Sequence, residues 1–223
     1  MNDEKMLRKI HFTMAVIGGF IGVYGILIRQ DLFGNSQTSN VIFIVISILG
    51  RNIFDFITRF FALLIYMAGT VIVVIWKKKI PYDVRYFAIA VDFFSLIILG
   101  LLPGNMDPVI GLYPIFFSAS VQWNVFAGVH GYNCSTIFST NNIKQFTISS
   151  TEYLLEKDPK KKHRATFYGL TLLSFYFGVT LGYFAVVLLD VKGAFLGLPI
   201  VLTALTLIRV SKHSINYEME PAK

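Results

Sequence analysis

Long apolar stretches, separated by short polar segments, dominate the pattern of residues along the chain. A transmembrane helix needs about 20 predominantly apolar residues, within a range of roughly 17–25. Six stretches reach or approach that length, and only Asp92 places a full charge inside any of them. They comprise residues 12–28, 60–76, 86–102, 109–129, 165–189 and 193–208. The pattern predicts an all-α transmembrane protein with six spanning helices, forming a single membrane domain over residues 1–223.

The distribution of positive charge predicts the orientation of these helices. Lys and Arg accumulate in the cytoplasmic loops of membrane proteins. With six spans and an inside N-terminus, 16 of the 20 Lys and Arg residues lie inside and four lie outside. If residues 41–49 also crossed, the best orientation would leave 14 inside and six outside, with the basic N-terminus outside. The six-span arrangement is therefore favoured, and both termini are expected in the cytoplasm.

Residues 41–49 form a seventh apolar stretch that is too short to cross the bilayer alone. They follow Asn35-Ser36-Gln37-Thr38-Ser39-Asn40, a run of small polar residues. Non-helical backbone at membrane depth is tolerated only where it is buried in protein or lines a wet cavity. This segment is expected to be re-entrant or interfacial, although an ordinary external loop followed by a short surface helix remains open.

Two parts of the chain resemble each other. Residues 20–25 and 126–131 share the pattern F-x-G-V-[YH]-G, and a T-x-N motif follows each of them, at 38–40 and 140–142. Because three crossings separate the copies, the second copy is inverted relative to the first. The chain is therefore expected to form two inverted three-helix repeats, about 11–103 and 109–210, each with a short re-entrant or interfacial segment after its first helix. Chance recurrence of Gly/Phe-rich patterns is the alternative.

Composition supports the membrane assignment and excludes other classes. Hydrophobic residues make up 55% of the chain and charged residues 15%, whereas soluble domains carry about 25% charged residues. The net charge of +7 is gathered in the loops, so nucleic-acid binding is not expected. A single cysteine, Cys134, excludes an intramolecular disulfide and a multi-Cys metal site. No pattern typical of a cofactor or metal site occurs, so neither a cofactor nor a bound metal ion is expected.

Asp92 is the first residue with potential chemistry. An intramembrane carboxyl is costly, so it suggests a proton relay, an ion site or a pairing partner. A protonated carboxyl that is hydrogen-bonded to a neighbouring helix explains the residue equally well. Arg59, at the edge of a span, is the nearest basic candidate for pairing.

Uncharged polar residues cluster in the two repeats. Short side chains that both donate and accept hydrogen bonds suit a site that must bind a solute and release it, and an indole adds a stacking face. The candidate solute-binding residues are Gln37, Thr38, Asn40, Trp123, Asn124, Thr140, Asn141 and Asn142. Hydrogen bonding between helices is the alternative for these amides.

These motifs resemble those of the YoaK-like family of small bacterial multi-pass membrane proteins, a domain of unknown function. Two departures are Gly22, where the family commonly has an acidic residue, and Ser39, where it has glycine; the first puts proton coupling through that position in doubt. The resemblance implies an uncharacterised protein of the bacterial inner membrane. The matching elements are Gly18-Gly19, Phe33, Gln37-Thr38-Ser39-Asn40, Gln122-Trp123-Asn124-Val125-Phe126 and Ser139-Thr140-Asn141-Asn142.

Together these features predict a small transporter or permease for a polar solute, with Asp92 providing proton linkage. A non-catalytic membrane scaffold or accessory subunit is the alternative. An enzyme is not expected, because no nucleophile–base pair or metal cluster can be assembled. The expected partners are the lipid bilayer and the solute, and a homo-oligomer remains open. A transporter should gather its polar motifs at a cavity, whereas a scaffold should bury them in helix contacts.

Overall fold

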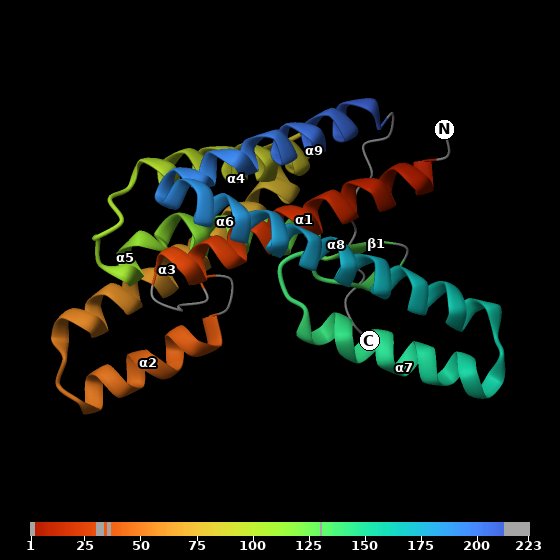
Figure 1. Cartoon of the computed structure of the whole chain (residues 1–223), viewed down its shortest axis with the longest axis horizontal. Coiled ribbons are helices and arrows are strands. Elements are labelled where there is room, and N and C mark those ends of the chain that lie inside the picture. The colour runs from red at the N-terminus through yellow and green to blue at the C-terminus, as the bar shows by residue number, and fades with distance from the viewer. Residues whose placement is uncertain (1–2, 30–33, 35–36, 130, 212–223) are drawn as a thin grey trace.

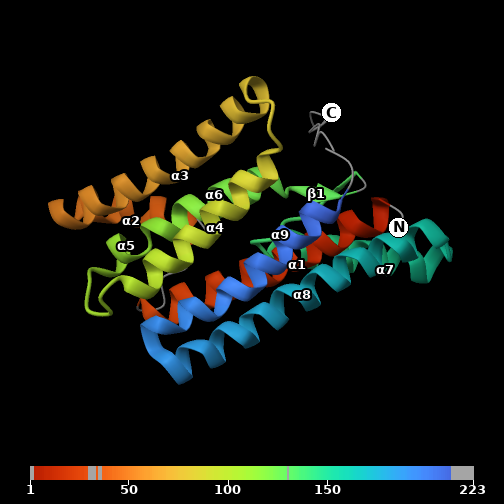
Figure 2. The same ribbon diagram turned by 90° about the horizontal axis from the view of Figure 1, so that it is seen from above.

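The computed structural model describes residues 3–29, 34, 37–129 and 131–211, which form a bundle of helices (Figures 1 and 2). The prediction of an all-α architecture is confirmed, with one two-stranded exception. In chain order the elements are α1 (Asp3–Ile28), α2 (Gln37–Leu49), α3 (Ile53–Lys79), α4 (Val84–Leu101), α5 (Pro108–Gly111), α6 (Tyr113–Val125), β1 (Gly128–Val129), β2 (Tyr132–Asn133), α7 (Thr140–Glu156), α8 (Pro159–Leu189), the 3₁₀ helix η1 (Asp190–Gly197) and α9 (Leu198–Val210).

Four helical segments are long and apolar enough to cross a membrane. They are Glu4–Ile28, Ile53–Lys79, Val84–Leu101 and Pro159–Val210. The last comprises α8, η1 and α9, and after η1 the chain reverses direction so that α9 packs against α1 and α4 (Figure 1). At 1.5 Å per residue, the 13 residues of α6 extend about 20 Å. The short apolar segment predicted over residues 41–49 lies within α2. This helix has 13 residues and is too short to cross the bilayer alone.

Short polar side chains define where several helices begin. Asn52, Asp83 and Asp158 precede α3, α4 and α8, and each side-chain oxygen accepts a backbone N–H bond from the first turn. These bonds satisfy donors that have no partner within the helix. At the C-terminal end of α7, Lys157 adopts a left-handed conformation with φ of 57°, and the chain reverses there into α8.

The helix predicted over residues 109–129 ends earlier than its apolar composition indicates. It is divided into α5 and α6, and beyond Val125 the chain forms the β1–β2 hairpin. A Cβ atom at Gly128 would lie 1.9 Å from the carbonyl oxygen of Tyr132, and Gly131 has a φ of +75°. Both positions therefore require glycine, and their conformations end the helix in a stretch that hydropathy alone treats as continuous.

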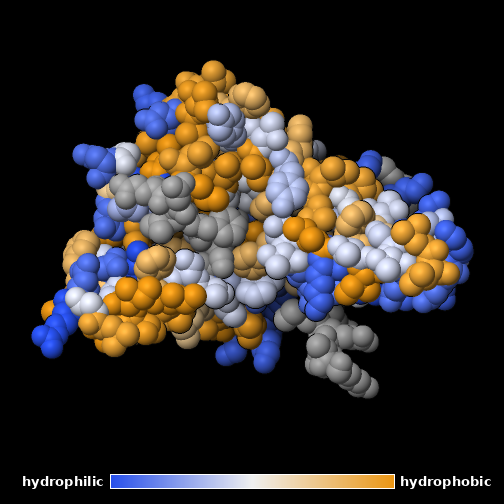
Figure 3. Space-filling view, turned by 60° about the horizontal axis from the view of Figure 1, so that its bottom comes forward, coloured by the Kyte–Doolittle hydropathy of each residue, from blue (hydrophilic) through white to orange (hydrophobic). Residues whose placement is uncertain are grey.

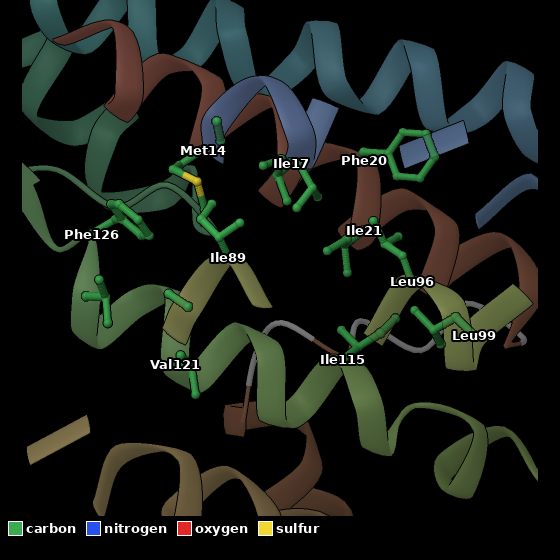
Figure 4. Packing of buried hydrophobic residues seen from close by; sticks show 14 of the residues in the cluster. Met14, Ile17, Phe20, Ile21, Ile89, Leu96, Leu99, Ile115, Val121 and Phe126 are labelled. Carbon is green, nitrogen blue, oxygen red and sulfur yellow. The ribbon is translucent and has the colours of Figure 1, made fainter. Parts of the chain in front are cut away.

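The centre of the bundle is packed from helices of both halves of the chain. Buried side chains of α1, α4 and α6 meet there (Figure 4). The most prominent are Met14, Ile17, Phe20, Ile21, Ile89, Leu96, Leu99, Ile115 and Val121, together with Phe126. In contrast, most apolar side chains of α2 and α3 are exposed, and the surface carries broad hydrophobic areas (Figure 3). An apolar exterior of this kind fits a lipid environment.

Contacts between helices connect the N-terminal and C-terminal parts of the chain. Helix α1 packs against α8 and α9, while α6 packs against α3 and α4. Helix α2 lies on α3, and α7 lies on α8. The two short helices point toward opposite ends of the molecule (Figure 1).

We expect cysteines introduced at Lys78 and Lys160 to react only with reagent on the cytoplasmic side, and one at Arg51 only with reagent outside. The reason is the concentration of positive charge at one end of the helices. Cys134 is buried, so its background labelling should be low. Accessibility to a membrane-impermeant maleimide measures the orientation. External labelling at Lys78→Cys or Lys160→Cys would exclude the six-span topology.

Candidate functional site

Asp92 lies fully buried in α4, opposite Ser118 of α6. The Ser118 hydroxyl donates to Oδ1 of Asp92 over 2.5 Å, while Oδ2 has no hydrogen-bond partner among the described residues. Arg59, the basic residue considered for pairing, instead donates from Nε to Asp55 on its own helix, at 3.0 Å. The buried carboxyl thus has one oxygen held and one oxygen open to a proton or to another donor.

Other polar side chains of α6 connect it to α1 and α3. Gln122 Nε2 donates to the carbonyl oxygen of Met14, at 2.8 Å, and to Thr136 Oγ1, at 3.0 Å. Asn124 Nδ2 donates to Thr70 Oγ1 of α3, at 3.0 Å. Because buried amides need partners, these bonds show that Asn124, a predicted solute-binding residue, joins two helices here.

Asn142 holds together the non-helical stretch that precedes α7. Its side chain is 1% exposed. Its Oδ1 accepts from the backbone N–H of Ser135 at 3.2 Å, and its Nδ2 donates to the carbonyl oxygens of Ser135, at 2.7 Å, and Phe138, at 3.1 Å. Ser135 Oγ in turn accepts from the N–H groups of Ile137 and Phe138. Side chains thus replace the backbone bonds that a continuous helix would supply.

Three of the predicted residues remain accessible beside this stretch. Trp123 is 41% exposed, and its ring meets Phe138 edge-on with the centroids 5.1 Å apart. Thr140 and Asn141 are exposed in the first turn of α7. The N-cap residue Ser139 makes no side-chain capping bond, which is the bond that commonly satisfies an N–H group of a first turn. An indole, a hydroxyl and an amide are therefore exposed around the stretch that leads into α7.

The corresponding residues of the first half lie on the α2–α3 hairpin. Asn40 is 4% exposed, and its Nδ2 donates to Gln37 Oε1 and to the carbonyl oxygen of Arg59, each at 3.0 Å. Thr38 is exposed. Among the described residues, no hydrogen bond connects this group with Thr140, Asn141 or Asn142. A single site shared by both T-x-N motifs stays a prediction.

The sequence did not identify every polar residue that organises this region. Ser118, Ser120 and Gln122 were not among the predicted site residues, yet each bonds to a different helix. With Asn124 they place a polar residue at every second position of one apolar stretch. Positions two apart turn by about 200° around a helix, so this spacing places polar residues on two opposite faces and indicates a helix that is contacted on both of them. Across the described ranges, no group of three His, Cys, Asp or Glu residues is arranged to hold a metal ion.

The apolar helices, the interrupted α5–α6 segment and the buried polar links define an all-α protein of the membrane type. Residues 10–208 match the model of a family described as "Protein of unknown function (DUF1275)". The chain belongs to this family, which confirms the resemblance seen in its motifs. No curated protein and no solved structure matches the chain.

Proposed function

We propose that this protein is a small transporter that carries a polar solute across the cytoplasmic membrane of a bacterium. It crosses the bilayer six times, by α1, α3, α4, the α5–α6 segment, α8 and the η1–α9 segment, with both termini in the cytoplasm. The observation that carries the proposal is the start of α7: this helix begins directly after a buried non-helical stretch and beside an accessible indole. Interrupted elements of this kind form substrate sites in transporters.

The proposed architecture is an inverted repeat in which α1–α4 correspond to α6–α9. Under this correspondence, the α1–α8 contact is equivalent to α6–α3, the α2–α3 contact to α7–α8, and the α4–α6 contact to α9–α1. Each of these pairs is packed together in the structure. The opposite directions of α2 and α7 also agree with an inversion (Figure 1). Relative movement of two such halves is the usual basis of alternating access.

The solute site lies at the start of α7, where Trp123 stacks against the solute. Thr140, Asn141 and backbone N–H groups of the first turn supply hydrogen bonds. Helix N-termini favour anionic groups and other acceptors, so the preferred solute carries a carboxylate or several oxygens. Gln37 and Thr38 serve the same purpose from the other half when the transporter changes state. Asp92, with its open Oδ2, carries the proton that accompanies the solute.

Uptake profiling tests this site. We expect a deletion strain complemented with the wild-type gene to accumulate at least one solute from a panel of amino acids, sugars and polyols. Trp123→Ala should lower that uptake by up to about tenfold, because an aromatic stacking contact contributes roughly 0.5–1.5 kcal/mol. Phe184→Ala, which removes an exposed aromatic ring of α8, should leave uptake unchanged. Equal uptake by the wild type and Trp123→Ala would remove the indole from the site.

A scaffold or accessory subunit is the second candidate, and one observation favours it. The amides of Asn124 and Asn142 are used in bonds within the protein, as expected for structural polar residues. A scaffold predicts no solute dependence in the profiling experiment, and it predicts that a partner protein is lost from the membrane when the gene is deleted.

A further inference from the structure

A groove of about 350 Å³ runs between α1, α8 and α9. Its walls are mainly apolar and include Val16 of α1, Phe177 and Leu181 of α8, and Ile200 of α9. None of the predicted solute-binding residues lines it. The groove is therefore separate from the proposed transport site and does not depend on the transport proposal.

The hydroxyl groups in this groove are already hydrogen-bonded. Thr13 donates to the carbonyl oxygen of Lys9 at 2.9 Å, and Ser174 donates to that of Leu170 at 2.8 Å. Thr203 donates to the carbonyl oxygen of Pro199 at 2.9 Å. Each bond lies within a single helix, so the hydroxyl protons do not point at an occupant. A hydrocarbon chain suits such a surface, whereas a polar solute would leave its own groups unpaired.

Two lysines of α1 lie just beyond the groove, toward the N-terminus of that helix. Lys9 precedes Thr13 by four residues and Lys5 precedes it by eight, so both lie on the same face of α1. At 1.5 Å per residue they lie about 6 and 12 Å beyond Thr13. Both side chains are exposed, and neither forms a salt bridge with a described residue. The two lysines are thus near the end of a spanning helix. A phospholipid has its phosphate at this level when its acyl chains occupy the hydrocarbon region.

We propose that the groove binds an anionic phospholipid, with an acyl chain against Val16, Phe177 and Ile200 and the phosphate at Lys9, supported by Lys5. The apolar lining of the groove and the position of the charges together select this ligand. A zwitterionic lipid presents the same chains but carries a compensating positive group. The site therefore binds phosphatidylglycerol more tightly than phosphatidylcholine.

Native mass spectrometry of the purified full chain tests this site, with phosphatidylglycerol and phosphatidylcholine of identical acyl chains as probes. The wild type should retain phosphatidylglycerol preferentially. Lys9→Gln should lower phosphatidylglycerol retention by about fivefold, the contribution of one basic residue near a membrane surface, without changing phosphatidylcholine retention. Ser174→Phe should lower the retention of both lipids, because the added ring fills the groove.

Matched variants separate this site from general adsorption. Lys78→Gln removes an exposed charge from α3, and Leu173→Phe enlarges an exposed side chain adjacent to Ser174 but outside the groove. Both should bind lipid like the wild type. If Ser174→Phe does not fold, Thr203→Phe fills the groove from α9 instead. Wild-type retention by Lys9→Gln or by the filled groove, or equal losses in the control variants, would overturn the proposal.

Discussion

Replacing Asn142 by Ala is expected to lower the free energy of unfolding by about 2–4 kcal/mol. The change removes three hydrogen bonds and leaves the N–H and C=O of Ser135 and the C=O of Phe138 without these partners. A buried polar group left unsatisfied costs roughly 1–3 kcal/mol, and partial rearrangement limits the sum. Equilibrium unfolding in mild detergent measures the difference.

Asn141→Ala provides the control for this change. Asn141 is the neighbouring residue, carries the same amide and is exposed, with a single side-chain bond to the carbonyl oxygen of Asn133 at 3.1 Å. Its loss should cost less than about 1 kcal/mol. Similar destabilisation by the two substitutions would show that Asn142 does not maintain the non-helical stretch.

Substituting Ala for Gly178 is expected to destabilise the protein by about 3 kcal/mol or more, and to reduce the yield of folded protein. A Cβ atom there would lie 2.0 Å from the carbonyl oxygen of Val16, and one at Gly19 would lie 2.0 Å from that of Phe175. Overpacking usually costs about 1–3 kcal/mol, and a backbone obstacle cannot move aside by changing rotamer. Helices α1 and α8 would therefore have to separate.

Gly169→Ala, on the same helix, is the matched control. A Cβ atom at Gly169 meets only the ring of Phe146, at 3.1 and 3.3 Å, and a side chain can shift by a few tenths of an ångström. We expect a change of less than about 1 kcal/mol in the free energy of unfolding. Detergent unfolding curves that are the same for Gly178→Ala and Gly169→Ala would contradict the close approach of α1 and α8.

Hydropathy predicted the long helices because burial in lipid depends mainly on the length of an apolar stretch. The cores of α1, α3, α4 and α8 follow from it directly. The end of α6 could not be predicted in this way. The close approach of Tyr132 to Gly128 and the positive φ of Gly131 are incompatible with a continuing helix, yet the average hydropathy of the stretch stays high. Residues 12–28 could be assigned without knowing their neighbours, whereas the chain after Val125 could not.

The candidate site was less predictable, because its contacts depend on the packing of distant helices. The sequence identified Asp92 as unusual, but its partner Ser118 lies 26 residues away on α6. The amide of Asn142 was identified as a candidate, but its structural role was not predicted. Its side chain reaches Ser135 and Phe138 only when the short stretch before α7 folds back on itself. The exposed residues Trp123, Thr140 and Asn141, together with Thr38 in the first half, are the part of the predicted site that is still available to a solute.

Transport by purified protein in sealed lipid vesicles tests the central claim most directly. The vesicles would be given a panel of amino acids, sugars and polyols, with and without an inward proton gradient, and the retained solutes would be identified by mass spectrometry. The wild type should accumulate at least one solute, and the gradient should increase its accumulation. Asp92→Asn should insert normally and lose the gradient dependence, because an amide cannot carry the proton. If folded wild-type protein accumulates no solute beyond empty vesicles under either condition, the protein is not a transporter of these solutes and the account is contradicted.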